Sequence, residues 1–110
     1  MNESLKEMWE LFELEEFPEG SRLREVEGLR FEQVDALAAA CVSAFIRLGA
    51  LDAECCAVLE ENLRRLNVMA DLADEADQPY FIRLRDIAHA VRDRAAALNP
   101  PAPAAGPGER

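Results

Sequence analysis

The sequence predicts an all-α fold, a small antiparallel helical bundle of three core helices with an N-terminal amphipathic segment lying across them. The first observation is that apolar residues recur at steps of three and four, the period of a helix with one buried face, in four segments: 3–17, 31–48, 53–69 and 79–98. The second is that the links between the last three segments are short, which favours antiparallel neighbours. Residues 1–98 are therefore expected to form a single helical domain.

Size and composition agree with one soluble domain. The chain has 110 residues, of which 50% are hydrophobic and 31% charged, so it is expected to fold without a metal or a disulfide. No apolar run reaches the ~18 residues that a membrane span needs. The N-terminus lacks the pattern of a signal peptide, and the cysteine count of 3 is odd. These features predict a cytoplasmic protein with reduced thiols.

The first segment, 3–17, places Leu5, Met8, Trp9 and Phe12 on one helical face and fills the rest mainly with glutamate. Its second half could also alternate as a short strand. Residues 18–30 contain Pro18, Gly20 and Gly28 and are expected to form an ordered loop that carries Leu23 and Val26 back to the core.

The central segment is expected to be a helical hairpin. Phe45 should be a central core residue of its first helix, whose apolar face comprises Val34, Leu37, Ala38, Cys41, Phe45 and Leu48, widened by Val42 and Ile46. Gly49 fits a left-handed helix end, and Asp52 fits the cap of the next helix. The second helix continues to about Met69 with Leu59, Leu63 and Leu66 on its apolar side, and Asn62 is a candidate buried polar residue.

An acidic connector, 70–78, leads to the last helix. Pro79 suits its first turn, with Asp77 or Gln78 as the cap. The remaining residues, 99–110, are rich in Pro, Ala and Gly and are predicted to be a disordered tail. Lys6 is the only lysine among the 12 basic residues, and this bias, with the many Ala and Pro, indicates a GC-rich genome, as in many bacteria.

The net charge of −10 is concentrated at the N-terminal end. Residues 1–32 hold ten acids and four bases, a net charge of −6. A surface of this kind repels nucleic acid and anionic membranes and attracts basic proteins. The simplest interpretation is solubility, and the functional one is a basic protein partner.

Two groups of residues could form chemical sites. Asp86, His89 and Asp93 share a helix face at a spacing that suits a metal or a general base, but neighbouring arginines oppose a cation there. Cys55 and Cys56 are adjacent and poorly placed to chelate one ion together. Buried apolar use of the thiols and a solvated face around His89 are the favoured interpretations. No catalytic motif is recognised, so neither an enzyme nor a metal or other cofactor is expected.

The functional prediction is a non-catalytic acidic protein-binding module, such as a stoichiometric inhibitor or immunity-type protein that binds a basic partner. The candidate partner-binding residues are Met8, Trp9, Phe12, Glu13, Glu15 and Glu16, because aromatics among acids are typical of binding surfaces. The competing interpretation is that the N-terminal aromatics close the core. The alternative function is a homodimeric helical module of structural or regulatory role that buries Met8, Val42 and Ile46 between two copies.

Overall fold

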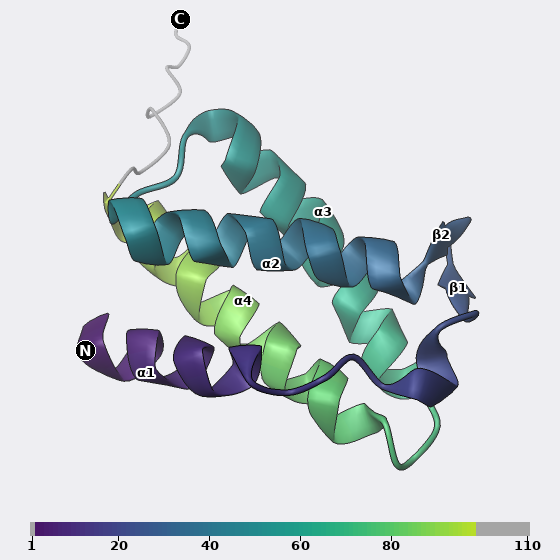
Figure 1. The fold of residues 1–110 in the computed structure, drawn as a ribbon. Coiled ribbons are helices and arrows are strands. Elements are labelled where there is room, and N and C mark those ends of the chain that lie inside the picture. Colours follow the sequence, from purple (N-terminus) through teal and green to yellow (C-terminus); the bar gives the residue numbers. More distant parts are fainter. Residues whose placement is uncertain (1, 99–110) are drawn as a thin grey trace, which may run out of the picture.

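The computed structural model describes residues 2–98, and it confirms the all-α prediction (Figure 1). The elements are, in order, α1 (Asn2–Glu13), the 3-10 helix η1 (Glu19–Ser21), β1 (Glu25–Val26), β2 (Leu29–Arg30), α2 (Phe31–Leu48), α3 (Ala53–Leu72) and α4 (Gln78–Leu98). The predicted disordered tail, 99–110, lies outside the described residues.

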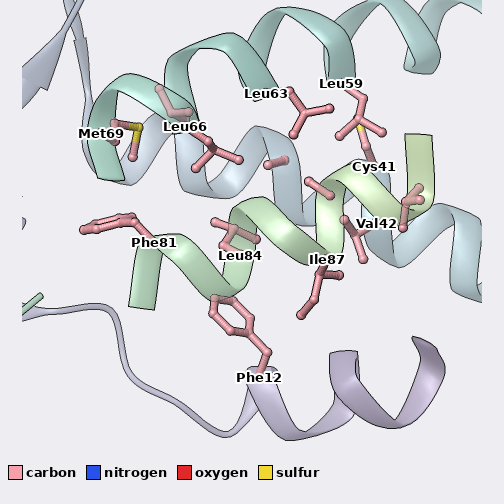
Figure 2. Close-up of a cluster of buried hydrophobic side chains, with 14 of the residues drawn as sticks. Phe12, Cys41, Val42, Leu59, Leu63, Leu66, Met69, Phe81, Leu84 and Ile87 are labelled. Atoms are coloured by element: carbon pink, nitrogen blue, oxygen red, sulfur yellow. The ribbon is translucent and has the colours of Figure 1, made fainter. Parts of the chain in front are cut away.

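The core forms where α2, α3 and α4 pack together, and α1 lies along α4 (Figure 1). Figure 2 shows the arrangement of its side chains, with one row from α3 facing α4. The α3 row is Leu59, Leu63, Leu66 and Met69, all at most 2% exposed. Phe45 of α2 is 6% exposed and belongs to the same cluster, as predicted. Burial of these side chains is the main source of stability in a domain of this size.

The predicted apolar face of α2 was wrong at two positions. Leu37 and Leu48 are 41% and 69% exposed, whereas Val42 is fully buried. The buried stripe follows Val34, Ala38, Cys41 and Phe45. Around the helix axis, residues 37 and 48 are rotated away from the centre of this stripe by most of the angle that separates one helical residue from the next. An apolar helix of this kind has more hydrophobic surface than its neighbours cover.

The turn between α2 and α3 has the predicted chemistry. Gly49 adopts a left-handed conformation with φ of 79° and ends α2. The carboxylate of Asp52 accepts a hydrogen bond of 2.8 Å from the backbone N–H of Cys55 and so caps α3. Helix α3 continues to Leu72, three residues beyond its expected end. Asn62 is 1% exposed, and its amide donates to the carbonyl of Val58 at 2.8 Å.

Residues 18–30 are ordered, but they include structure that the sequence analysis did not predict. Strands β1 and β2 form an antiparallel hairpin in which Val26 pairs with Leu29. Glu27 and Gly28 have φ of 54° and 81°, the left-handed pair that a tight two-residue hairpin turn requires. Glu27 also receives hydrogen bonds from two arginines of α3. Leu23 is 82% exposed and does not pack in the core, whereas Val26 does.

The first segment is helical, so its strand alternative was wrong, but α1 ends at Glu13, four residues before the predicted end of the segment. Its rings extend an aromatic cluster on α4: Trp9 stacks on Phe12 with 5.6 Å between ring centroids, and Phe12 lies 4.7 Å from the ring of Tyr80. The Tyr80 hydroxyl donates to the Asp35 carboxylate at 2.7 Å and links α4 to α2. This cluster fixes α1 on the bundle and decides which of its side chains remain outside.

Candidate protein-binding surface

The structure divides the six predicted partner-binding residues into three groups, one of which is Glu15 alone, partly buried and paired with Arg83. The rings of Trp9 and Phe12 are 4% and 5% exposed and belong to the core. These two rings therefore do what the competing interpretation expected and close the core. Met8 is 44% exposed, and the side chains of Glu13 and Glu16 are also exposed. The rings thus point inward, whereas Met8, Glu13 and Glu16 point outward.

A pocket of about 220 Å³ lies between α1 and α4. Its lining residues are Met8, Leu11, Phe12, Glu15, Arg83, Asp86 and Ile87. Figure 2 shows Phe12 of α1 reaching toward α4, from which Ile87 projects. Both of these side chains are buried, whereas Leu11 is 67% exposed. The pocket therefore has an apolar floor and an open apolar side, here called the α1–α4 pocket.

Helical periodicity explains why these residues meet. On α1, the buried stripe of Leu5, Trp9 and Phe12 follows steps of four and three, and Met8 and Leu11 lie on the adjacent flank. On α4, the lining residues lie three and four positions apart and therefore share one face. Packing of α1 on α4 by its buried stripe leaves the two flanks side by side.

Two of the residues that line the pocket, Glu15 and Arg83, form an ion pair with each other. The Arg83 guanidinium donates two hydrogen bonds to the Glu15 carboxylate, of which that from Nε is 2.7 Å long. This bidentate contact joins the chain that follows α1 to α4. It leaves little free positive charge at the pocket, because the arginine is neutralised by its partner. Asp86, also in the lining, lies 3.2 Å from the guanidinium of Arg85.

The outer side of α1 carries carboxylates without cationic partners. Within residues 2–98, no ion pair engages Glu7, Glu10, Glu13 or Glu16. No basic residue occupies the last turn of α1, although a helix C-terminus carries a partial negative charge. An acid in such a turn is unfavourable by ~0.3–1 kcal/mol. The C-terminal end of α1 therefore concentrates uncompensated negative charge beside the α1–α4 pocket.

The outer face of α2 is apolar and has no charged residue between Asp35 and Arg47. Leu37 and Leu48 are its large exposed side chains, and the surface between them is formed by Ala36, Ala40, Ser43 and Ala44. This uncharged surface is here called the α2 face. The dimer surface expected from the sequence does not form as predicted: Val42 is buried and Ile46 packs against the core, and only Met8 of its three residues is well exposed.

The groups around His89 form ion pairs. Nδ1 of His89 lies 3.1 Å from the guanidinium of Arg92, which also lies 3.2 Å from the carboxylate of Asp93. In the part of the chain that the structure describes, no three His, Cys, Asp or Glu side chains are grouped so that they could hold a metal ion. The arrangement agrees with the solvated, mixed-charge interpretation of this face.

The three cysteines are free thiols. Cys41 is buried, which raises its pKa to about 11. The pKa of Cys55 is also raised, first by its hydrogen bond to the Asp52 carboxylate. Both thiols are therefore protonated at neutral pH, the form in which cysteine is a poor nucleophile.

The α4 side of the pocket was not predicted from the sequence. Asp86 was considered only as a metal or general-base candidate with His89, and Arg83 and Ile87 were not among the candidate binding residues. Glu15 and Arg83 are 68 positions apart, and no pattern in a single sequence indicates that they pair. The 3.6-residue period of each helix does place the relevant flanks, but which flanks meet depends on how α1 docks.

Two further observations concern membrane-spanning helices and similarity to known proteins. Among residues 2–98, no helix is both long and apolar enough to span a bilayer. Searches of protein-family models, of curated proteins and of solved structures find no match to the chain.

Proposed function

We propose that the chain is a non-catalytic acidic protein-binding module, of the stoichiometric inhibitor or immunity type, that binds a basic partner in the cytoplasm. The observation that carries the proposal is the outer side of α1. There the exposed Met8 and Leu11 lie among Glu7, Glu10 and Glu13, which have no cationic partner within residues 2–98.

Each part of this surface has a role in binding. Unpaired carboxylates attract a basic protein over a distance set by the ionic strength and speed its encounter. Exposed aliphatic side chains then lose water on contact and slow its escape. Acids in the last turn of α1 oppose the helix dipole, and a cationic partner would relieve that repulsion. A local rule broken at the surface in this way is typical of functional sites.

The rest of the chain supports a binding role over a catalytic one. The Cys41 thiol has a raised pKa, and the His89 ring lies against an arginine. A net charge of −10 disfavours nucleic acid and anionic membranes as partners. A basic protein is the macromolecular partner that this charge attracts.

The test is affinity capture from a lysate of the source cells with two matched variants. One variant combines Glu7→Gln, Glu10→Gln and Glu13→Gln on α1. The control combines Glu25→Gln, Asp71→Asn and Glu75→Gln, which neutralises the same number of exposed acids around the opposite end of the molecule (Figure 1).

We expect wild type and control to capture the same basic protein stoichiometrically and to release it in high salt. The α1 variant should capture much less of it. Equal capture by all three proteins, or a captured protein that is acidic, would contradict the proposal.

A homodimeric module is the second candidate function, and the α2 face is the observation that favours it. Two copies of an acidic chain repel each other except where the facing surfaces lack charge. The α2 face meets that condition between Asp35 and Arg47. A dimer formed there should persist in low and high salt alike, because its contact would be apolar. Sedimentation at two salt concentrations measures this directly.

A further inference from the structure

We infer that the α1–α4 pocket receives one aliphatic or aromatic side chain from a basic helical segment of the partner. The inference rests on the proposed function and assigns its contact point. It adds Leu11, Arg83, Asp86 and Ile87 to the binding surface, none of which was among the predicted residues.

The size of the pocket favours a single side chain. Its volume is about 220 Å³, whereas pockets that hold drug-sized ligands have volumes of roughly 300–1,000 Å³. One leucine, methionine or phenylalanine side chain is a better match. In many protein interfaces a few residues that fill desolvated pockets contribute most of the binding free energy.

The walls of the pocket have the matching chemistry. Phe12 and Ile87 form a buried apolar floor, and Met8 and Leu11 form a movable apolar side. Methionine adapts its shape to different apolar groups because it is unbranched and polarisable. In the rest of the lining Glu15 is paired with Arg83, and Asp86 is paired with Arg85, so a charged anchor would find no unpaired counter-charge there. The pocket therefore selects an apolar side chain.

The surroundings define the charge of the residues that flank the anchor. Glu7 lies one helical turn before Leu11 on α1 and is exposed and unpaired within residues 2–98. Asp86 on the α4 side is already paired with Arg85, so the unpaired negative charge beside the pocket comes from α1. Lysine or arginine three or four positions from the anchor of a helix lies within reach of the same surface as the anchor. Acidic flanking residues would be repelled.

A helix fits better than an extended segment. An extended peptide binds by adding a strand to a sheet edge. In residues 2–98 the sheet is the short hairpin of β1 and β2, at the end of the molecule away from α1 (Figure 1). The α1–α4 pocket instead lies between two helices, as in complexes in which an amphipathic helix enters a groove.

Binding can be measured with synthetic probes and methionine methyl NMR. The probe is a peptide of lysine with leucine at every third or fourth position. Two control peptides replace its leucines by alanine or its lysines by glutamate. We expect the leucine–lysine peptide to shift the methyl signal of Met8 and leave that of Met69, which is fully buried, unchanged. Neither control peptide should shift Met8.

Two leucine variants locate the contact. Leu11→Gln changes the pocket wall, and Leu37→Gln makes the same change on α2; both side chains are more than a third exposed, so the fold tolerates either change. We expect Leu11→Gln to weaken peptide binding by about tenfold or more, because a buried leucine contact is lost. Leu37→Gln should bind as wild type does. Circular dichroism verifies that both variants remain folded.

The results separate this inference from the proposed function. Absence of a Met8 shift, equal binding of the alanine peptide, or full affinity of Leu11→Gln would each overturn the pocket assignment. Capture of a basic partner that depends on the α1 carboxylates would then still support an acidic binding module. If the pocket binds the peptide but the α1 charge variant captures the partner unchanged, the proposed function fails instead.

Discussion

The outer side of α1 and the α2 face expose leucines to the same degree, but the first is acidic and the second is uncharged. Leu11 on α1 is 67% exposed and Leu48 on α2 is 69% exposed. Around Leu11 lie unpaired glutamates, with no base in the last turn of α1. The α2 face has no charge along its middle, and Arg47 in the last turn of α2 complements the helix dipole.

The difference indicates that charge, rather than apolar exposure, distinguishes the two surfaces. An apolar patch gains a similar free energy per unit of buried area whatever its partner. The field around it determines which partners arrive and how salt affects them. The α1 side therefore suits a basic protein, and the α2 face suits an uncharged surface such as its own copy.

The inner sides of the two helices differ as well. Helix α2 lies within the three-helix core and is buried at positions along its whole length, from Phe31 to Phe45. Helix α1 packs mainly against α4, through three buried side chains, Leu5, Trp9 and Phe12. The acidic surface is therefore carried by a helix whose position depends on a few large contacts. Four predictions follow from this difference, in order of their expected effect on stability.

Trp9→Ala should destabilise the fold by ~3–5 kcal/mol, the usual loss when a large buried aromatic side chain is removed. Leu11→Ala, two positions along the same helix, should change stability by no more than ~0.5 kcal/mol, because its side chain is largely exposed. Urea unfolding followed by circular dichroism measures both. Similar losses in the two variants would show that α1 is not packed by one side, and the comparison would fail.

Tyr80→Phe should cost ~1–3 kcal/mol at neutral pH, because it leaves the Asp35 carboxylate without its donor. Burial raises the pKa of Asp35, and the Tyr80 hydrogen bond partly opposes this. Folding therefore favours the protonated form of Asp35. The stability that Asp35 contributes is greatest below its unfolded pKa of ~3.8 and is lost as the pH rises through its folded pKa.

Without the tyrosine hydroxyl, the folded pKa of Asp35 should rise further. The deficit of Tyr80→Phe should then shrink when unfolding is measured at about pH 3, where the carboxyl is protonated in both states. A deficit that stays constant between acid and neutral pH would show that Tyr80 does not act through the Asp35 charge. An Asp35→Asn background provides the control, because the deficit of Tyr80→Phe measured there should not change between acid and neutral pH.

Reversing the charge in the last turn of each helix should have opposite effects. Glu13→Lys on α1 should raise the Tm by about 1–5 °C, because a base there complements the helix dipole. Arg47→Glu on α2 should lower the Tm by a similar amount. Glu13→Lys should also weaken capture of the basic partner while it stabilises the fold. A Glu13→Lys variant that is both less stable and fully able to bind would refute the role given to the α1 acids.

Much of the fold could be predicted because its signals are local. The period of the apolar residues defined four helices, and Gly49 and Asp52 marked the turn of the hairpin by backbone and capping chemistry. Leu37 and Leu48 were assigned to the core because periodicity defines a face but not its width. How much of that face is covered depends on neighbouring helices. The β-hairpin was not predicted because each of its strands has only two residues.

The candidate site could be predicted only in part. The acids and Met8 were recognised from composition, but Trp9 and Phe12 could not be assigned to core or surface until the position of α1 was known. The pocket also needs Arg83 and Ile87, which come from a helix more than 60 positions away along the chain. A single sequence carries periodicity within each helix and no information on the docking of one helix upon another.

The smallest effect on stability is expected for Leu37→Glu on the α2 face, within ~0.5 kcal/mol for the monomer, because the side chain already contacts water. Its effect on self-association should be much larger. A glutamate on a surface that faces its own copy sets two like charges against each other in an apolar contact. Sedimentation should therefore show loss of any salt-independent dimer in Leu37→Glu and its retention in the matched Leu11→Glu. The reverse result would place self-association on α1, and charge would no longer distinguish the two surfaces.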